Sequence, residues 1–486
     1  MITVRTQTPE FISDIGDMLR LFLGDVAISE VDGQAAYEHE VICKNGMITD
    51  RWTHSDCSHA ITLPQPAGSE IEIRRARKRQ VKMALYELLK KMTKLDLPWG
   101  ALTGIRPTRL LYEALDRGMD IAAARSHVMT EFDVSADRAD LLCEIAEMQR
   151  GIRVPEKDSF DLYIGIPFCK TRCSYCSFSS GEIGRNKKLV APYTEALLRE
   201  IERSAEIMRQ AGLKVRAAYM GGGTPTAIPC DDLERILARA RECFPGAVEW
   251  TVEAGRPDTI TEENLKMLRR MEISRISVNP QTFDDETLRR IGRLHTGEDT
   301  VRAYRMARDL GFDDINMDLI AALPGETPEI FRRTLDRVLE LAPESVTVHS
   351  LAIKRSSKLH EQMHVSGAGH TQVSAAGAAE MIGHARRLLG ESGWKPYYLY
   401  RQKYMAGNME NVGYARPGKA CLYNIGNMEE TASVLALGAG AISKWLFDRD
   451  LRIERAANVK NIEEYIGRID EMVQRKRALI LPEERA

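Results

Sequence analysis

Three cysteines stand within eight residues of the sequence, in the segment GIPFCKTRCSYCSF (165–178). They are Cys169, Cys173 and Cys176, spaced C-x-x-x-C-x-x-C, in a chain with nine cysteines among 486 residues. A zinc site usually takes four ligands in two separated pairs, whereas iron–sulfur clusters are held by cysteine thiolates. Three thiolates on a four-iron cluster leave one iron to bind a small chelating molecule. The spacing therefore indicates a metal centre with one open position.

A structural role for these cysteines is the alternative, because cysteine is often buried in protein cores. Lys170, Thr171 and Arg172 separate the first two cysteines, and such polar residues favour an exposed loop. The metal centre is therefore the preferred interpretation.

The elements that must position this loop form a repeating pattern. After residue 160, six short apolar runs alternate with amphipathic helical stretches, which predicts a parallel sheet with right-handed crossovers. Six units are too few for a full eight-unit barrel, so we predict a partial, open (β/α)6 barrel. The runs are DLYIGIPF (161–168), VRAAYMGGG (215–223), VEWTVEAG (248–255), ISRISVNPQ (273–281), DINMDLIAAL (314–323) and SVTVHSLAI (345–353).

Residues suited to chemistry fall where these predicted strands end. The cysteine loop follows the first strand and GGGTPT (221–226) ends the second. Alone, a glycine run is usually a tight turn and a carboxylate often caps a helix. In barrels of this kind, however, the chemistry gathers at the carboxyl ends of the strands. The later strands contribute Glu253, Gln281, Asp318 and Ala352 in that order.

The whole chain is expected to be an α/β protein of three parts. Residues 1–150 read as an α+β domain of unassigned role, 151–364 as the barrel, and 365–486 as a C-terminal cap with a helical tail. In the first part, AYEHEVICKN (36–45) and HAITLPQ (59–65) predict strands, and the alternation in SEIEIRR (69–75) predicts another.

Composition excludes several functional classes. The net charge of −2 and pI of about 6.6 offer no general attraction for nucleic acid or acidic membranes. No apolar run is long enough to span a bilayer, and the first residues lack a signal-peptide pattern. The odd, uneven set of cysteines argues against a disulfide framework, so we expect a cytoplasmic protein.

Two further segments leave alternatives open. The basic run RRARKRQVK (74–82) favours a solvated helix face over an anion or RNA site. The stretch PWGALTGIRPTRL (98–110) favours a packed loop between domains over the lining of a ligand pocket.

The cysteine motif after the first strand of a partial barrel, with Tyr175 before the last cysteine, resembles the radical S-adenosylmethionine (radical SAM) superfamily. The resemblance implies that the methionine part of the cofactor chelates the fourth iron of a [4Fe–4S] cluster. Reduction then yields a deoxyadenosyl radical. YIGIPFC, YMGGGTPT, VNPQTFDDETLRRIGRLHT and INMDLIAALPGET together resemble the oxygen-independent coproporphyrinogen III oxidase family, and the N-terminal region resembles its longer, HemZ-type branch.

This resemblance implies roles for individual residues. Cys169, Cys173 and Cys176 would ligate the cluster, and one or two S-adenosylmethionine molecules would bind beside it. Glycine suits the cofactor contact because a side chain would keep backbone amides from the ligand. The implied cofactor-binding residues are Tyr163, Tyr175, Gly222, Gly223, Thr224, Glu253, Gln281, Arg293, Asp318 and Ala352.

The sequence departs from the family pattern at two places. Oxidases of this family carry a fourth cysteine two residues after the third, where this chain has Phe178. The related haem chaperones also lack it, but typically show His-Asn where this chain has Tyr423–Asn424 in CLYNIGNM. Met405, Met409 and Met428 are alternative haem ligands, although methionine more often fills core gaps.

The leading expectation is an anaerobic oxidase that turns propionates of coproporphyrinogen III into vinyl groups, giving protoporphyrinogen IX. A haem chaperone without decarboxylase activity and a radical SAM haem methyltransferase are the alternatives. An electron donor such as flavodoxin or ferredoxin is expected. Substrate carboxylates would bind cations, for which a surface role is equally open; the candidates are Arg106, Arg109, Lys354, Arg355 and Arg401.

Overall fold

The chain forms two compact units, Met1–Cys143 and Glu144–Ala486, in a computed structural model. Residues 1–24, 26–104, 106–154, 158–354, 356–366, 373–402, 409–447 and 452–481 are described. The boundaries expected at residues 150 and 364 stay predictions. No helix among the described residues is long and apolar enough to cross a membrane.

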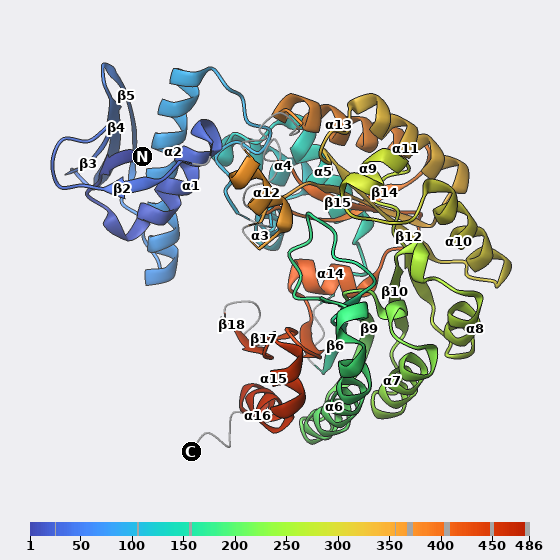
Figure 1. Ribbon diagram of the computed structural model, residues 1–486. Coiled ribbons are helices and arrows are strands. Elements are labelled where there is room, and N and C mark those ends of the chain that lie inside the picture. Colours follow the sequence, from blue (N-terminus) through green and yellow to red (C-terminus); the bar gives the residue numbers. More distant parts are fainter. Residues whose placement is uncertain are drawn as a thin grey trace. The chain divides into compact units, whose positions relative to one another are not determined.

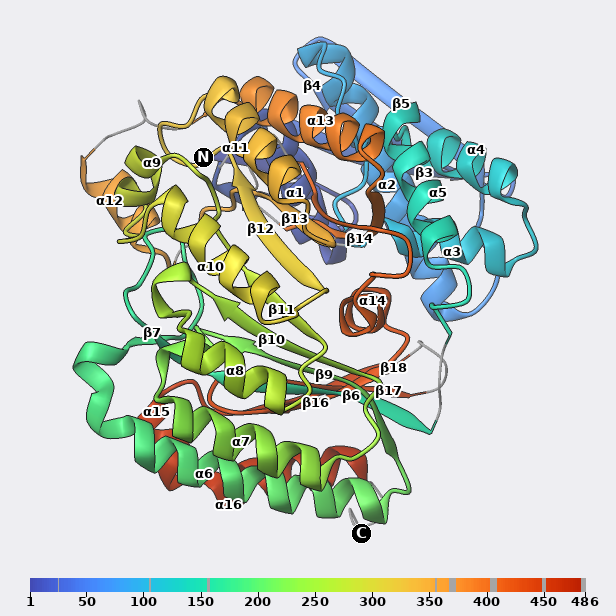
Figure 2. The same ribbon diagram turned by 90° about the vertical axis from the view of Figure 1, so that its right-hand side faces the viewer.

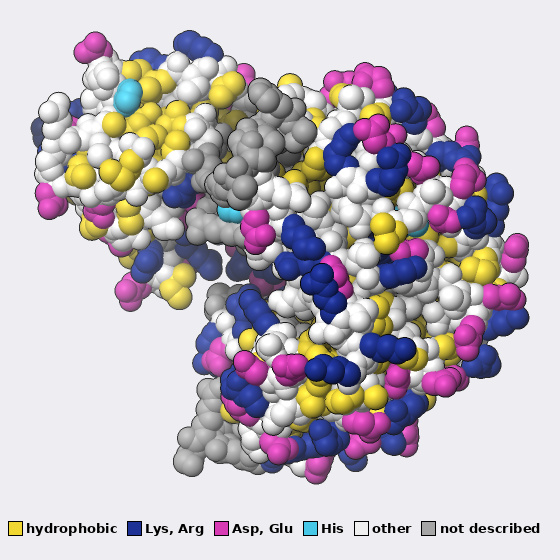
Figure 3. Space-filling model, in the orientation of Figure 1, with side chains coloured by type: hydrophobic (Ala, Val, Ile, Leu, Met, Phe, Trp, Pro, Cys, Tyr) yellow, Lys and Arg dark blue, Asp and Glu magenta, His cyan; other side chains and the backbone are white. Residues whose placement is uncertain are grey.

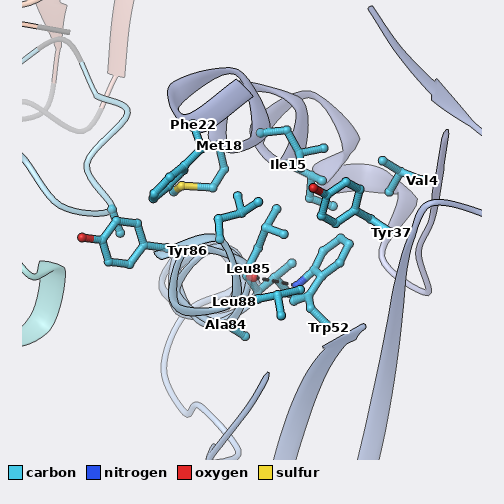
Figure 4. Close-up of a cluster of buried hydrophobic side chains, with 14 of the residues drawn as sticks. Val4, Ile15, Met18, Phe22, Tyr37, Trp52, Ala84, Leu85, Tyr86 and Leu88 are labelled. Atoms are coloured by element: carbon cyan, nitrogen blue, oxygen red, sulfur yellow. Dashed lines mark hydrogen bonds between the residues drawn. The ribbon is translucent and has the colours of Figure 1, made fainter. Parts of the chain in front are cut away.

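The first unit is a five-stranded sheet with two helices packed on it (Figures 1 and 4). Its strands, in the order β2-β1-β3-β4-β5, bury Trp52 against α2, where its indole N–H donates to the Val81 carbonyl at 3.0 Å. Three further helices complete the unit and begin the next. The elements are β1 (Ile2–Arg5), α1 (Ile12–Leu23), β2 (Ile28–Glu30), β3 (Tyr37–Lys44), β4 (Met47–His54), β5 (Cys57–Pro64), α2 (Glu70–Thr93), α3 (Thr108–Asp116), α4 (Ile121–Phe132) and α5 (Ala136–Met148).

The prediction of a strand at 69–75 is wrong, because this segment begins helix α2. Ser69 accepts a hydrogen bond from the Glu72 amide, while the Glu72 carboxylate accepts one from the Ser69 amide. This reciprocal capping box satisfies amides that the first turn leaves unpaired, and it outweighs the apparent alternation.

The basic run that follows lies in helix α2, where Arg77, Lys78 and Arg79 are half-buried and meet partners within the same unit. Arg77 binds Asp50 in a fork at 2.7 and 2.9 Å, and Lys78 lies 3.4 Å from Asp14. The 98–110 stretch is also packed, since Trp99 is fully buried.

The second unit is built on an eleven-stranded sheet whose central strands are the six predicted ones. They lie in the order β13-β12-β11-β10-β9-β6, all parallel, which confirms the partial barrel. Their bounds are β6 (Ser159–Ile166), β9 (Lys214–Gly222), β10 (Glu249–Gly255), β11 (Arg275–Val278), β12 (Ile315–Ala321) and β13 (Ser345–Ser350).

The C-terminal segment extends this sheet at both edges. Strand β16 (Ser433–Leu437) pairs in parallel with β6 and carries β17 (Ile442–Phe447) and β18 (Arg452–Ala457). At the other edge, β15 (Asn411–Ala415) runs antiparallel to β13 and pairs with β14 (Lys395–Tyr400). Residues far apart in sequence therefore close the two flanks of the barrel.

Helices cover the outer side of the curved sheet, while one short helix lies on its inner side (Figure 2). The inner helix is α14 (Leu422–Glu429). The others in this unit are α6 (Ile183–Gln210), α7 (Cys230–Cys243), α8 (Glu262–Arg270), α9 (Asp285–Arg290), α10 (Gly297–Asp309), α11 (Pro328–Leu341), α12 (Lys358–Ser366), α13 (Ala375–Glu391), α15 (Ile462–Gly467) and α16 (Ile469–Ile480).

Helix α14 closes the amino-terminal end of the barrel strands. Glu249, the first residue of β10, accepts hydrogen bonds from the amides of Leu422 and Tyr423 at 3.0 and 3.3 Å. A carboxylate suits a helix N-terminus because it satisfies unpaired amides and complements the helix dipole. Nearby, Arg216 binds Asp161 in a buried fork and donates to the Leu422 carbonyl. The opposite, carboxyl end is the one that carries the cysteine loop.

Candidate active site

The cysteine loop leaves the end of β6 and is fastened on both sides. Two short strands, β7 (Phe168–Cys169) and β8 (Gly181–Glu182), pair in parallel and draw its ends together. At its middle, the Ser174 amide donates to the Ile291 carbonyl at 3.0 Å, and the Ser174 carbonyl accepts from Leu359 at 2.8 Å. The loop is therefore held by neighbouring barrel segments rather than by its own short sequence.

Donors that follow later strands reach two of the three thiols. Thr224 donates to Cys169 Sγ at 3.7 Å, and Arg256 to Cys173 Sγ at 3.8 Å. Burial raises the pKa of Cys169 and raises that of Cys176 to about 11. A bound metal reverses this preference because coordination removes the thiol proton. Cysteine sulfurs that accept N–H and O–H bonds match what iron–sulfur clusters require, so these residues fit the implied group.

The glycine run after β9 lies directly against the cysteine loop. The Gly223 amide donates to the Ile166 carbonyl at 2.8 Å, and the Thr224 amide to the Phe168 carbonyl at 2.7 Å. A Cβ at Gly223 would lie 2.5 Å from the Phe168 carbonyl oxygen, so a larger residue would push the two segments apart. Glycine here is required by this close approach.

Glu253 and Asp318 both face the barrel interior, with opposite pKa shifts. Burial raises the pKa of Glu253 to about 7, although a 2.6 Å hydrogen bond from the Tyr219 hydroxyl acts to lower it. Burial also disfavours the Asp318 carboxylate, but hydrogen bonds from His349 and Asn316 outweigh it and lower its pKa. The interior thus holds one readily ionised carboxylate and one that titrates near neutral pH.

Gln281 links β11 to β12 beyond the regular strand. Its amide donates to the Asp318 carbonyl at 2.9 Å, its φ is +69°, and no described residue pairs with its buried Oε1. Arg293 donates to the Asn279 carbonyl at 2.5 Å and lies 3.5 Å from the Tyr175 hydroxyl. The cluster loop and the strand ends are therefore brought together by these contacts.

Tyr163 and Ala352 complete the set predicted from the sequence. Tyr163 stands on β6 with its ring 6.4 Å from that of Tyr219, and burial raises its pKa. Ala352 is half-buried just beyond the end of β13. All thirteen predicted ligand and cofactor positions lie in the second unit, at or beyond the strands that the sequence indicated; their roles stay proposals.

Sequence reasoning missed several residues of this interior. Tyr219 and Tyr423 stack at 4.7 Å between centroids, so α14 contributes an aromatic ring to the barrel. His349 on β13 has its Nε2 3.9 Å from Asp318 Oδ2 and its Nδ1 3.4 Å from the Tyr400 hydroxyl. The sequence could have indicated His349, because it lies three residues before Ala352 near the end of a predicted strand. It could not have indicated Tyr400, which lies on the antiparallel edge of the sheet.

The predicted substrate cations are scattered. Arg106 and Arg109 belong to the first unit, and Arg109 pairs with Glu113 at 3.0 Å. Lys354 is exposed after β13, and Arg401 is buried after β14. Arg355 lies outside the described residues, as does Met405. Of the other methionines, Met409 is buried and Met428 packs against an apolar cluster.

Comparison with known proteins identifies the central region. Residues 163–338 match the Radical SAM superfamily. The chain is 40% identical over 420 residues to "Oxygen-independent coproporphyrinogen-III oxidase-like protein HemZ" of Bacillus subtilis, covering 85% of this chain and 82% of the relative.

Two more distant relatives bear different descriptions. "Heme chaperone HemW" of Bacillus subtilis is 33% identical over 41% of this chain and 52% of its own length. The structure described as "Coproporphyrinogen III oxidase (HemN) from Escherichia coli is a Radical SAM enzyme" is similar at TM-score 0.53 and 27% identity. That similarity covers 68% of this chain and 73% of the other.

Proposed function

Because the chain belongs to the radical SAM superfamily, among the HemZ-type relatives of oxygen-independent coproporphyrinogen III oxidase, we propose that it decarboxylates propionates of coproporphyrinogen III. Each of two propionates loses CO₂, one hydrogen atom and one electron and becomes a vinyl group, giving protoporphyrinogen IX of haem biosynthesis. The supporting observation is the extent of the match to the HemZ-type relative, which at 85% of the chain includes part of the first unit.

Cys169, Cys173 and Cys176 hold a [4Fe–4S] cluster in this proposal, and S-adenosylmethionine binds at its open iron. Bound together, the two supply the radical that abstracts hydrogen from the propionate. Gly222, Gly223 and Thr224 border the methionine part of the cofactor. Their backbone lies against Ile166 and Phe168, which fixes the distance between that cofactor contact and the cluster loop.

Glu253, Asp318 and Gln281 hold the polar groups of one or two S-adenosylmethionine molecules. The ionised carboxylate of Asp318 accepts from ligand hydroxyl or amino groups, and the unpaired Gln281 Oε1 adds an acceptor. Arg293 keeps Tyr175 and the 279–280 backbone in place beside the cluster loop. The enclosing tyrosines exclude water from the space where the radical forms.

His349 and Tyr400 are proposed to contact the tetrapyrrole. They face the same interior as Asp318 and carry hydrogen-bond donors suited to a propionate. Of the cationic candidates, Lys354 and Arg401 flank the ends of β13 and β14, so they are the preferred anchors for the remaining carboxylates.

A haem chaperone is the second candidate, and Phe178 is the observation that favours it, because the oxidases have a fourth cysteine there. Tyr423 favours the oxidase instead. Its ring is enclosed between Tyr163 and Tyr219, and the neighbouring Asn424 donates to the Tyr397 hydroxyl at 3.2 Å. That position is therefore occupied by packing rather than presented to a haem iron.

An anaerobic assay tests the proposal. The protein with reconstituted cluster is given S-adenosylmethionine, dithionite and coproporphyrinogen III, and protoporphyrinogen IX, CO₂ and deoxyadenosine are followed together. We expect all three from the natural chain and none from Cys173→Ala. The control is Cys243→Ala on the outer helix α7, which should leave iron content and turnover unchanged.

Deoxyadenosine without protoporphyrinogen IX would reject the oxidase while keeping the radical centre. Haem titration would then separate the remaining candidates. Tight binding of haem without turnover would indicate the chaperone, and methyl transfer to haem the methyltransferase.

A further inference from the structure

A group of cations lies on and beside the cysteine loop. We call this group, together with the exposed Phe178 of the same loop, the loop rim. Between residues 170 and 188 the sequence has five Lys and Arg residues and one carboxylate, although the whole chain carries a net charge of −2. The cations of the rim are four of these, Arg172, Arg185, Lys187 and Lys188, together with Lys358 at the start of α12.

Contacts show that the rim is continuous. Arg172 of the cysteine loop donates to the Ser356 carbonyl at 2.8 Å, next to the start of α12. From there Lys358 reaches Glu182 at 3.6 Å, and Arg185 reaches the same carboxylate at 3.5 Å. Lys187 and Lys188 follow, exposed on the first turns of α6. Figure 3 shows Lys and Arg side chains gathered on the face around the start of α6.

Phe178 gives the rim an exposed apolar side chain close to the cluster ligands. Its side chain is 64% exposed, although large aromatic side chains usually gain stability by burial. The Phe178 amide donates toward Cys176 Sγ, so the exposed ring belongs to the residue that contacts a ligand sulfur. The proposed decarboxylation uses neither Phe178 nor the cations of the rim.

The five cations of the rim outnumber Glu182, the carboxylate that pairs with two of them. Such a surface beside an exposed aromatic side chain is typical of one that recruits an oppositely charged partner. The charges speed and orient the encounter, and the aromatic side chain contributes contact once water is displaced. The amino end of α6 adds the positive end of a helix dipole to the same field. The complementary partner is an acidic protein.

We propose that the loop rim is the docking surface for an acidic protein that carries single electrons, which reduces the cluster at the loop edge. This inference rests on the proposed radical chemistry. One electron leaves the carrier, which is oxidised by one electron, and enters the cluster, which is reduced by one. A small interface suffices, because electron-transfer encounters are weak and bury little surface.

Binding of purified flavodoxin, and in parallel of purified ferredoxin, to the cluster-loaded chain tests the inference by calorimetry. We expect affinity for at least one carrier at low salt that falls steeply between 50 and 300 mM NaCl. In Lys187→Glu/Lys188→Glu this affinity should fall at least tenfold. The matched control, Arg302→Glu/Arg305→Glu, reverses two exposed cations on helix α10 and should bind like the natural chain.

Phe178→Ala tests the contribution of the exposed apolar side chain. It should weaken binding several-fold and leave the salt dependence unchanged, with iron content measured to verify the cluster. Dithionite-driven formation of deoxyadenosine should be equal in the natural chain and Lys187→Glu/Lys188→Glu, since a chemical reductant needs no docking surface.

Salt-independent binding, or equal affinity in the two charge-reversed variants, would overturn the docking proposal. Neither carrier binding the natural chain at low salt would overturn it too. None of these outcomes tests the decarboxylation proposal, because the decarboxylation assay uses dithionite as the reductant and needs no protein electron carrier.

Discussion

Glu253 is a side chain of the candidate site whose charge changes within the physiological pH range. Burial raises its pKa to about 7, and the Asp318 charge adds to the effect. The acid therefore keeps its proton below about pH 7 and becomes a carboxylate above it. Asp318, whose pKa is lowered, is ionised throughout this range.

If only the Glu253 carboxylate accepts hydrogen bonds from S-adenosylmethionine, affinity should increase about tenfold between pH 6 and pH 8. Equilibrium dialysis with the cluster-loaded protein measures this increase. Glu253→Gln keeps the shape and removes the titration, so its affinity should be lower at pH 8 and nearly flat with pH. An identical pH profile in both proteins would show that another group is responsible.

For the three thiols, the residue type and its spacing were enough to predict the kind of site. Cysteine spacing indicated the metal centre, and the donors from Thr224 and Arg256 then explained how buried sulfurs are accommodated. Those donors come from the second and third barrel strands. No local pattern around Cys169 or Cys173 specifies them.

Among the elements, helix α14 depends on one small residue. A Cβ at Gly426 would lie 2.1 Å from an Arg216 guanidinium nitrogen and 2.6 Å from Asp161 Oδ2. These two side chains form the buried fork that joins β6 to β9. The helix can approach the barrel end only because the position has no side chain.

Gly426→Ala should therefore lower the stability of the second unit by about 1–3 kcal/mol, the usual cost of overpacking. Gly383→Ala in α13 is the matched control, because nothing lies within 4 Å of a Cβ there. In a helix interior it should be stabilising by about 0.5–1 kcal/mol. Thermal unfolding of both variants measures the contrast. Equal effects would mean that contact with Arg216 is unimportant.

At the scale of the whole molecule, the C-terminal helices are tied to the first helix of the barrel by a buried ion pair. Lys476 on α16 donates to Glu200 on α6 at 2.6 Å, and both side chains are essentially fully buried. Glu200 also accepts from Asn458 and from the Gly438 amide at 2.8 Å each. Since Gly438 follows β16, the network fixes the strand that flanks β6 and its cysteine loop.

Lys476→Met should be costly, because it leaves Glu200 buried without its cation. Losing one partner of such a pair usually costs about 3–5 kcal/mol. Arg475→Met on the same helix breaks a part-exposed pair with Glu471 and an exposed hydrogen bond to the Ala457 carbonyl, for which about 0–1 kcal/mol is expected. Denaturant unfolding followed by tryptophan fluorescence compares the two. Similar losses would contradict the role of the buried pair.

The sequence alone determined the elements whose signal is local. Six apolar runs gave the parallel strands, and counting along each run placed Cys169 after the first strand, Glu253 near the end of the third and Asp318 within the fifth. The alternation at 69–75 misled because it was preferred over the S-x-x-E signature of Ser69 and Glu72, which form the capping box that begins the helix.

Only the tertiary structure decided what closes the barrel. Strand β16 pairs with β6 although the two are more than 250 residues apart in sequence, and β15 pairs with β13 across the intervening helices α12 and α13. Hydrogen bonds between distant strands depend on which edges remain unpaired after the core has formed, and no short pattern records this. For the same reason, only the structure could show that His349 lies beside Asp318 and Tyr400. The same holds for the stacking of Tyr423 on Tyr219.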